Sequence, residues 1–253
     1  MIPKLEVNGV SYSYHSLDGE TLALDHISFD VSPGEFLAIV GPSGCGKSTL
    51  LSMLCGLTQP EGGTITIDGV RLTKSPSAIG YMLQKDHLFE WRNIFSNISL
   101  GLEIQKRLDE PARLELLDMM SAYGLAGFEY AKPSELSGGM RQRAALLRTY
   151  LFSGSVALLD EPFSALDMLT KKSVHNWYLK VMDEIHLSTL FITHDIDEAI
   201  LLSDRIYLLT GRPGRITEEL IIKETKPRDR DFGLTEEFLE YKRHILRHLE
   251  TTV

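Results

Sequence analysis

The sequence predicts an α/β fold built on a mainly parallel β-sheet. Residues 36–40, FLAIV, are continuously apolar, which is typical of a strand buried on both faces of a sheet. A glycine-rich loop and a helix are expected to follow over residues 41–56. Later in the chain, short apolar runs alternate with helical patterns. Because a strand followed by a helix usually returns to a parallel neighbour, we expect a sheet covered on both faces.

The N-terminal part of the chain is rich in strand patterns. Residues 4–40 contain runs of strand character separated by turns. Residues 64–68 alternate strictly between polar and apolar positions, and residues 79–83 form another short candidate strand.

From about residue 88 to 150 the chain shows no convincing strand pattern. Pro111 suits the first turn of a helix, and Leu114, Leu117 and Met120 follow at helical spacing. We therefore expect a helical insertion within the α/β frame.

The alternation of strands and helices resumes after this insertion. Strands are expected at residues 156–159, 189–193 and 205–209. A helix before the second of these is predicted by apolar residues at steps of three and four: Val174, Trp177, Tyr178, Val181, Met182 and Ile185. A short helix is expected over residues 195–203. After a polar linker at 223–233, a last helix at about 235–250 would bury Phe238, Ile245, Leu246 and Leu249.

The length and composition are those of one large domain. A chain of 253 residues with 43% hydrophobic residues can bury a substantial core. We interpret residues 1–253 as a single domain. Its α/β core would comprise residues 1–87 and 151–222, with a helical subdomain at 88–150 and a linker and helix at 223–253.

The charge and the apolar runs argue against several classes of protein. Lysine and arginine total 26 and aspartate and glutamate total 35, so the net charge is −9. No run of basic residues offers a surface for nucleic acid. There is no pattern of a secretion signal, and no apolar run approaches the ~20 residues of a membrane helix, so we expect a soluble protein. Cys45 and Cys55 lack metal or redox spacing and are expected to be reduced, cytoplasmic thiols.

Residues 41–48, GPSGCGKS, match the phosphate-loop pattern G-x-x-x-x-G-K-[ST] between a strand and a helix. Successive amide N–H groups and the helix N-terminus would bind a β-phosphate. Lys47 would reach the β- and γ-phosphates, and the Ser48 hydroxyl would bind Mg²⁺. The alternative is a glycine-rich turn without a ligand. We expect a nucleoside triphosphate bound by Gly41, Pro42, Ser43, Gly44, Cys45, Gly46, Lys47, Ser48 and Thr49.

Four polar residues follow expected strands and are candidates for catalysis. Asp160 and Glu161 end a buried strand, where ligands of such sheets bind. Asp160 would hold Mg²⁺, and Glu161 would be the base that orients the attacking water. His194 and Gln84 each follow another strand, and Gln84 could contact Mg²⁺ or the water. Each has an ordinary alternative. Asp160 and Glu161 could simply end a strand, His194 could cap a helix, and Gln84 could be a polar loop residue.

The stretch LSGGMRQ at residues 136–142 places two glycines where a helix should begin. Glycine in a helix interior costs about 1 kcal/mol relative to alanine. A close approach to Gly138 and Gly139, or a helix cap at residues 137–139, would explain them.

With these residues in place, the chain resembles the ATPase subunits of ABC transporters. Motifs of that family occur in its usual order: residues 41–48, Gln84, LSGGMRQ at 136–142, LLDEP at 158–162, SALD at 164–167, and His194. The resemblance extends from residue 4 to about 222. It implies a P-loop NTPase fold of the ABC cassette type, with a mainly parallel core, an N-terminal antiparallel β-region and a helical subdomain.

The resemblance implies that the site is shared between two subunits. Ser137, Gly138 and Gly139 of one subunit would cap the γ-phosphate held by the other, in a head-to-tail homodimer enclosing two ATP molecules. Gln142 is the last residue of this motif and is also expected at the nucleotide. Residues 164–167 would line the contact between the subunits. The metal would be Mg²⁺, held by Ser48, Gln84 and Asp160.

The resemblance also implies that adenine stacks on an aromatic side chain of the first β-region. Tyr12 and Tyr14 both qualify, and the family's spacing favours Tyr14. The stretch from residue 14 to 24 is longer and more polar than usual. The sequence therefore leaves open whether Tyr12, Tyr14 or neither stacks on adenine.

Finally, the resemblance implies partners in a membrane. Residues 84–104, with Leu88, Phe89, Trp91 and Ile94, would contact an integral permease, although core packing would equally explain Trp91. Residues 193–205, 211–215 and 227–230 resemble the nitrate, sulfonate and taurine import branch, which also serves pyrimidine precursors of thiamine. A peripheral subunit on the cytoplasmic face of the membrane, served by a solute-binding protein, is therefore expected. The alternatives are an ABC ATPase acting on ribosomes or DNA, and a nucleotide-sensing regulatory module.

Overall fold

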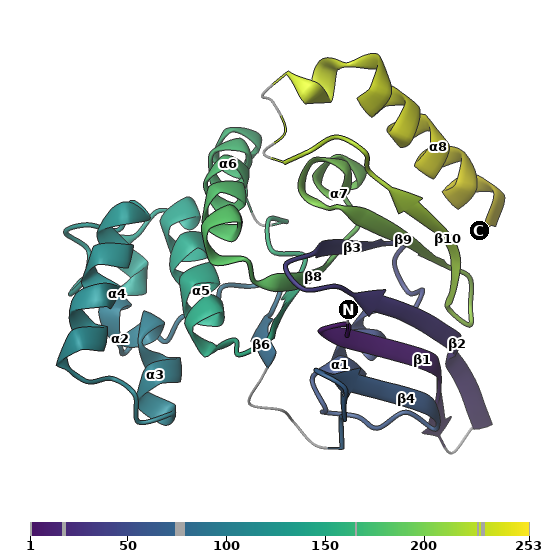
Figure 1. The fold of residues 1–253 in the computed structure, drawn as a ribbon, viewed down its shortest axis with the longest axis horizontal. Helices are drawn as coiled ribbons and strands as arrows, with labels where there is room; N and C mark the ends of the chain where they lie inside the picture. The colour runs from purple at the N-terminus through teal and green to yellow at the C-terminus, as the bar shows by residue number, and fades with distance from the viewer. Residues whose placement is uncertain are drawn as a thin grey trace.

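The strands form two β-sheets in the computed structural model, which describes residues 2–16, 19–73, 79–164, 166–226, 228 and 231–252 (Figure 1). The first sheet is antiparallel, in the order β2 (Gly19–Val31), β1 (Leu5–Ser16), β4 (Gly62–Ile67) and β5 (Val70–Arg71). The second has the order β10 (Arg215–Ile221), β9 (Arg205–Thr210), β3 (Phe36–Val40), β8 (Ser188–Thr193), β7 (Val156–Asp160) and β6 (Ile79–Met82). From β9 to β6 all neighbours are parallel, which confirms the predicted fold class.

Strand β3 lies between two hydrophobic cores, and this explains its unbroken apolar sequence. Leu37 and Ile39 pack into one core with the antiparallel sheet and helix α1 (Lys47–Leu54). Phe36, Ala38 and Val40 pack into the other core with the helices on the opposite face. All five residues of the strand are buried, because side chains of both parities face packed elements.

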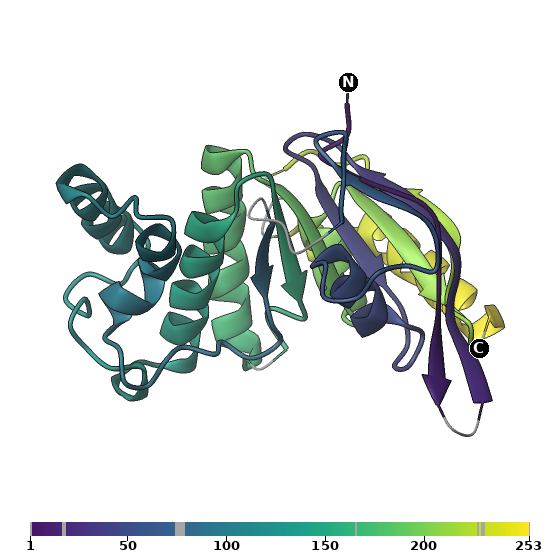
Figure 2. The same ribbon diagram turned by 90° about the horizontal axis from the view of Figure 1, so that it is seen from below.

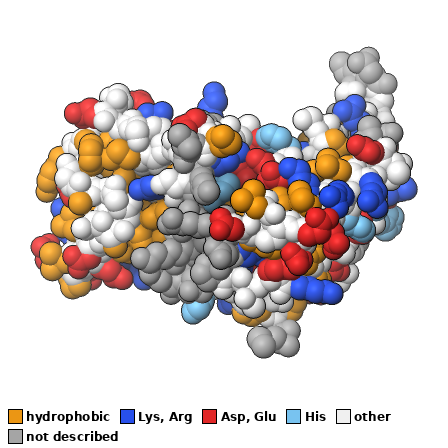
Figure 3. Space-filling view, turned by 90° about the horizontal axis from the view of Figure 1, so that it is seen from above, with side chains coloured by type: hydrophobic (Ala, Val, Ile, Leu, Met, Phe, Trp, Pro, Cys, Tyr) orange, Lys and Arg blue, Asp and Glu red, His pale blue; other side chains and the backbone are white. Residues whose placement is uncertain are grey.

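The helical part lies at the end of the molecule opposite the antiparallel sheet (Figure 1, Figure 2). It contains α2 (Ile94–Ile98), α3 (Leu100–Ile104), α4 (Glu110–Ala122) and the short 3₁₀ helix η1 (Pro133–Glu135). Helices α5 (Gly138–Phe152) and α6 (Met168–Ile185) stand between these and the strands. On the face drawn in Figure 3, hydrophobic side chains gather at this helical end.

The helical spacing predicted for α4 matches its buried side only in part. Leu116 and Met120 are buried, whereas Leu114 is exposed and Leu117 is half-buried. The helix begins at Glu110, and Leu114 lies in its first turns on the solvent side. The two buried residues, Leu116 and Met120, are four positions apart and therefore share one face. Of the face predicted for α6, Val174, Tyr178 and Val181 are buried and Trp177 is half-buried, while the side chains of Met182 and Ile185 lie outside the described residues.

The C-terminal part adds an edge strand that the sequence analysis missed. Strand β10 pairs antiparallel with β9, and its residues alternate between exposed and half-buried. Its polar sequence, RITEELI, conceals the pattern because neither face is fully covered. Helix α8 (Glu236–Thr252) then packs on α7 (Ile196–Leu202) and β9, with Phe238 and Ile245 buried. Leu249 is half-buried against the same core, whereas Leu246 is 40% exposed, so its predicted burial was wrong.

The predicted linker contains a buried anchor. Arg228 donates hydrogen bonds to the carbonyl oxygens of Ile200, Leu201 and Ser203 at the end of α7. A cation at a helix C-terminus interacts favourably with the helix dipole. Within the described residues, none of the helices has both the length and the hydropathy needed to cross a membrane.

Candidate functional site

The candidate site lies at the carboxyl edge of the parallel sheet. Residues 41–48 follow β3, Gln84 follows β6, and His194 follows β8. Asp160 ends β7, and Glu161 is the next residue. Because these four strands are adjacent and parallel, the residues that follow them meet at one edge.

The loop at residues 41–48 wraps around the Lys47 side chain. The Lys47 ammonium donates hydrogen bonds to the carbonyl oxygens of Gly41 and Pro42, at 2.7 and 2.8 Å. Gly46 has a φ of 100°, a conformation that favours glycine, and directly precedes α1. Burial raises the pKa of the Cys45 thiol, so this side chain stays protonated and packs as an apolar group. The loop therefore points a cation and a helix N-terminus at one place.

A cavity of about 500 Å³ opens over this loop. It is bordered by the β1–β2 hairpin, the loop, the end of β7 and the β9–β10 turn, through Tyr14, Thr21, Leu22, Ala23, Ser43, Gly44, Gly46, Lys47, Ser48, Thr49, Glu161 and Arg212. That volume is in the range of sites for small organic ligands. The cavity collects most of the residues that the sequence predicts at the phosphates.

Of the two candidate tyrosines, Tyr14 borders the cavity, and its hydroxyl lies 2.9 Å from the Thr49 hydroxyl. The ring of Tyr14 is half exposed. Tyr12 packs against the core and meets the edge of the Tyr14 ring, with centroids 5.1 Å apart. The geometry favours Tyr14 as the aromatic surface for a base.

The Glu161 carboxylate is held by two of the other predicted catalytic side chains, Gln84 and His194. The Gln84 amide nitrogen donates to Oε2 at 3.0 Å, and His194 Nδ1 lies 2.9 Å from Oε1. The backbone of Glu161 has a φ of 45°, and its N–H donates to the Ile192 carbonyl. Three strand ends thus fix one carboxylate, which is the requirement for a positioned base.

Asp160 lies beside this carboxylate in an environment that disfavours its charge. Burial, and then the Glu161 charge, raise the pKa of Asp160. The Tyr81 hydroxyl donates to Asp160 at 3.5 Å, a contact that the sequence analysis did not predict. A cation bound between Asp160 and the Ser48 hydroxyl would reverse this bias, and oxygen ligands of this kind suit Mg²⁺. The donor set therefore fits the predicted metal.

The paired-glycine turn, residues 137–139, lies apart from this cavity. Ser137 caps α5 by accepting a hydrogen bond from the Met140 N–H. Ser137 and Gly138 are exposed and Gly139 is buried. Among the described residues that border the cavity, none comes from residues 136–142. Gln142 is 3% exposed, inside the helical packing, so its predicted contact with nucleotide stays a prediction.

The two glycines of this turn differ in what surrounds them. A Cβ at Gly139 would lie 2.6 Å from the Thr170 methyl group, so the packing of α5 on α6 explains this glycine. A Cβ at Gly138 would come no closer than 3.9 Å to any described atom outside its own helix turn. Packing within the chain therefore leaves Gly138 unexplained.

Behind His194, a buried ion-pair network fixes the start of α7. Asp195 caps this helix by accepting from the N–H groups of Asp197 and Glu198. Lys171, from α6, lies 3.0 Å from Asp195 and 2.7 Å from Glu198, which is almost fully buried. The network connects α6, which follows residues 164–167, to His194. Residue 165 lies outside the described residues, so segment 164–167 is not described in full.

A second surface, near Gln84, is apolar. A groove of about 680 Å³ is bordered by Phe89, Ile104 and Arg148, among others. Trp91 is 74% exposed and stacks on Phe89, with ring centroids 4.7 Å apart. Leu88 and Ile94 are buried, so ordinary core packing, one of the two expected explanations for this segment, accounts for them.

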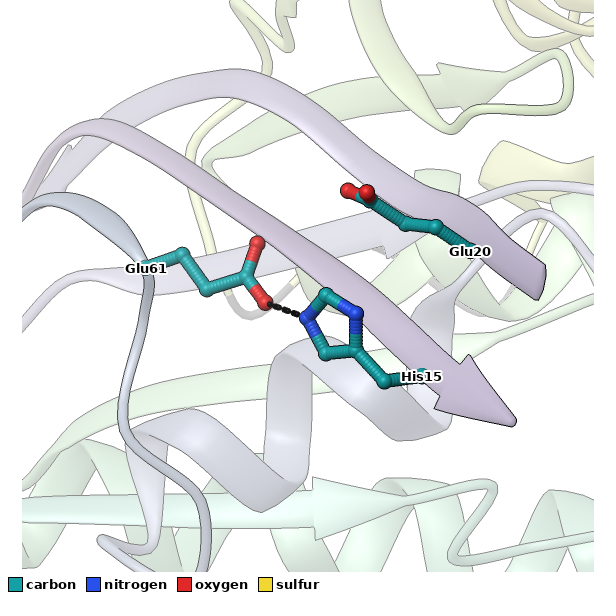
Figure 4. A group of neighbouring side chains, drawn as sticks. All are labelled: His15, Glu20 and Glu61. Carbon is teal, nitrogen blue, oxygen red and sulfur yellow. Dashed lines mark hydrogen bonds and ion pairs between the residues drawn. The ribbon is translucent and has the colours of Figure 1, made fainter. Parts of the chain in front are cut away.

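At the outer end of the β1–β2 hairpin, His15 and Glu20 form a cluster with Glu61, which directly precedes β4 (Figure 4). His15 and Glu20 are cross-strand neighbours, and His15 Nε2 lies 2.8 Å from Glu61. All three side chains are exposed. Exposed pairs of this kind are ordinary features of a protein surface, and we assign no metal site to them.

Comparison with known proteins shows the family to which the chain belongs. Residues 24–164 match the family described as ABC transporter. The chain belongs to the ABC transporter family. This match confirms the resemblance seen in the motifs. The chain is an ATP-hydrolysing cassette of this family.

Curated ABC relatives cover nearly the whole chain. The uncharacterized ABC transporter ATP-binding protein YtlC of Bacillus subtilis is 45% identical over 84% of this chain and 82% of its own. The nitrate import ATP-binding protein NrtD of Synechocystis is 38% identical, covering 98% and 96%. The aliphatic sulfonates import ATP-binding protein SsuB of Bacillus cereus is 37% identical, covering 97% and 96%.

Solved ABC cassettes share the fold. The dimeric cassette MJ0796, in a post-hydrolysis state bound to ADP and Pi, aligns with a TM-score of 0.74 at 27% identity, covering 87% of this chain and all of that one. The cbiO1 protein of Clostridium perfringens, part of the cbiONQ transporter complex, aligns with a TM-score of 0.78 at 25% identity, covering 97% and 100%.

Proposed function

We propose that this ABC cassette works as a head-to-tail homodimer that drives import of a small solute through separate membrane subunits. The observation that carries the proposal is the exposed Gly138, which no packing among the described residues explains. In a dimer, Ser137 and the N–H groups of residues 138 and 139 would reach the γ-phosphate held by the other copy. The dimeric relative MJ0796 supports this arrangement.

In each site, ATP would bind with its base against Tyr14 and its phosphates over residues 41–48. Ser48, Asp160 and the amide oxygen of Gln84 would hold Mg²⁺, which when bound neutralises phosphate charge. Glu161 would orient and deprotonate the attacking water, and His194 would hold Glu161 in place through the contact already formed in this structure. Lys47 and the partner's glycine turn would stabilise the charge that develops on the γ-phosphate.

Dimer closure would be passed to the membrane subunits through the segment after Gln84. The groove beside Phe89 and the exposed Trp91 provide apolar surface for a permease helix. The protein would then lie at the cytoplasmic face of the membrane. The nitrate and sulfonate import relatives favour a small anion as the solute, with a thiamine pyrimidine precursor as the other candidate, delivered by a solute-binding protein.

The experiment that tests the proposal is Ser137→Arg, which places a bulky cation on the exposed turn. We expect nucleotide binding to the isolated chain to persist, while hydrolysis falls by at least about 100-fold and ATP-dependent dimers disappear from a sizing column. Ser134→Arg, at an exposed position just before this turn, is the control for added charge. If Ser137→Arg monomers hydrolysed ATP at the parent rate, the shared site would be wrong.

A further inference from the structure

Arg212 borders the nucleotide cavity, although it belongs to none of the motifs that bind phosphate. It lies in the turn between β9 and β10, within the stretch GRPGR at residues 211–215. Its Nη2 donates to the Ser43 carbonyl oxygen at 3.3 Å, across 169 residues of sequence. The same cavity is bordered by Gly44, Lys47 and Tyr14.

The guanidinium occupies the space that a side chain at residue 44 would fill. A Cβ at Gly44 would lie 2.5 Å from Arg212 Nη2 and 3.1 Å from Cζ. Gly44 has a φ of 81°, which favours glycine, and a side chain at this position would displace the Arg212 guanidinium. The phosphate loop and Arg212 are therefore packed as one unit.

The turn that carries Arg212 is fixed to the rest of the site. The Gly214 N–H donates to the Ala23 carbonyl at 2.9 Å, and Gly214 accepts from the Asp25 N–H at 3.0 Å. A Cβ at Gly214 would lie 2.0 Å from the Cys45 carbonyl oxygen, so the turn rests directly on the loop. Arg215 holds the far side of the turn through Asp25, with Nε 2.8 Å from Oδ2.

The charges around the cavity leave Arg212 available for a ligand. Lys47, Arg212 and Glu161 are the charged side chains among the described residues that border it. Glu161 is occupied by Gln84 and His194, and Lys47 by two carbonyl oxygens. Arg212 has one hydrogen bond within the described part of the chain, and a guanidinium carries five N–H donors in a planar fork. Such a fork matches the oxygens of a phosphate.

We propose that Arg212 is a nucleotide-binding residue whose guanidinium contacts the phosphate oxygens of ATP and of ADP. The inference rests on the proposed use of this cavity for ATP. It adds a second cation, delivered by the β9–β10 turn, to the loop amides and Lys47. The positive charge of Arg212 at the edge of the cavity then raises the affinity for both nucleotides and slows the release of ADP after hydrolysis.

The test is Arg212→Ala, assayed by equilibrium binding of fluorescent ATP and ADP analogues to the full chain. We expect the Kd for both to rise about tenfold and the dependence of binding on salt to weaken. Arg212→Lys should recover part of the affinity. The matched control Arg243→Ala, an exposed arginine on α8 that does not border the cavity, should bind like the parent. An unchanged melting temperature of the nucleotide-free variant shows that the fold is intact.

Two other results are distinguishable. If the Kd of Arg212→Ala for both analogues is within twofold of the parent value, the proposal is overturned. A variant with unchanged affinity but a defect in dimerisation would also overturn it, because Arg212 would then act at the contact with the second copy. If the parent does not bind the analogues, or if Lys47→Ala binds them as tightly as the parent, nucleotide binding does not depend on this cavity and the proposed function fails.

Discussion

The phosphate loop at residues 41–48 and the paired-glycine turn at 137–139 both place glycines before a helix, for different physical reasons. The loop is surrounded by its own chain: Arg212 covers Gly44, and Lys47 fills the loop. In the turn, Gly139 is fixed by Thr170, but Gly138 faces solvent. One half of the proposed site is assembled by folding, whereas the turn, as the proposed other half, would offer N–H donors to a second copy.

In line with this comparison, the carboxylate proposed as the base is already held in place in a single chain. Glu161 is oriented by Gln84 and His194 without any second copy. Preorganisation of this kind lowers the reorganisation needed at the moment of reaction. The remaining requirement, closure over the γ-phosphate, would then be the step that a transport cycle controls.

The largest expected effect comes from removing the base on the assembled side. Glu161→Gln keeps the size of the side chain but cannot accept a proton from water. We expect hydrolysis to fall by at least about 100-fold while ATP binding survives, so that an ATP-bound dimer accumulates on a sizing column. Turnover at the parent rate would show that Glu161 is not the base.

The two glycines of the turn can be separated by a matched pair of variants. Gly138→Ala has room for its Cβ and gains helix propensity, so we expect no loss of stability but a fall in hydrolysis of about tenfold or more. Gly139→Ala meets the Thr170 methyl group and should lower the free energy of unfolding by about 1–3 kcal/mol. Melting temperature and kcat are measured for both. Equal destabilisation by the two variants would contradict the comparison.

A smaller effect is expected at the surface near Gln84. Trp91→Ala removes an exposed ring from the proposed permease contact, and should reduce solute-stimulated hydrolysis in the reconstituted transporter about fivefold. Tyr130→Ala is the control, because Tyr130 is 82% exposed and does not border the groove. Hydrolysis by the isolated subunit is measured in parallel, so that a loss of coupling is distinguished from a loss of catalysis. Equal solute stimulation of hydrolysis in Trp91→Ala and Tyr130→Ala would show that Trp91 does not take part in the permease contact.

The smallest effect concerns stability and its pH dependence at Asp160. The folded state raises the pKa of this carboxyl above its ordinary value of 3.8, so its charge opposes folding at neutral pH. Asp160→Asn should therefore raise the melting temperature at pH 7 in the absence of Mg²⁺, by about 1–3 °C. The penalty in the parent is relieved as the pH falls through the raised pKa, so the difference should narrow toward acid. A lower melting temperature in the variant at pH 7 would contradict this assignment.

Local sequence was sufficient where a residue's role depends on its place along a strand or helix. The apolar run at 36–40 and the residues after β6, β7 and β8 were predicted because strand ends are visible in the chain. Burial was less accessible to the sequence: the helical spacing in α4 included Leu114, which is exposed, and the segment expected at a partner included Leu88 and Ile94, which are buried. Spacing defines a face of an element but not what covers that face.

The sequence by itself determined that this chain builds a phosphate loop, a carboxylate pair and a second glycine turn, because each is a contiguous pattern with its own local chemistry. Tertiary structure decided that Tyr14 rather than Tyr12 borders the cavity, that Gly138 and Gly139 differ, and that Arg212 reaches Ser43. These are contacts between elements far apart in the chain, and only the packing of the two sheets and their helices brings the atoms within reach.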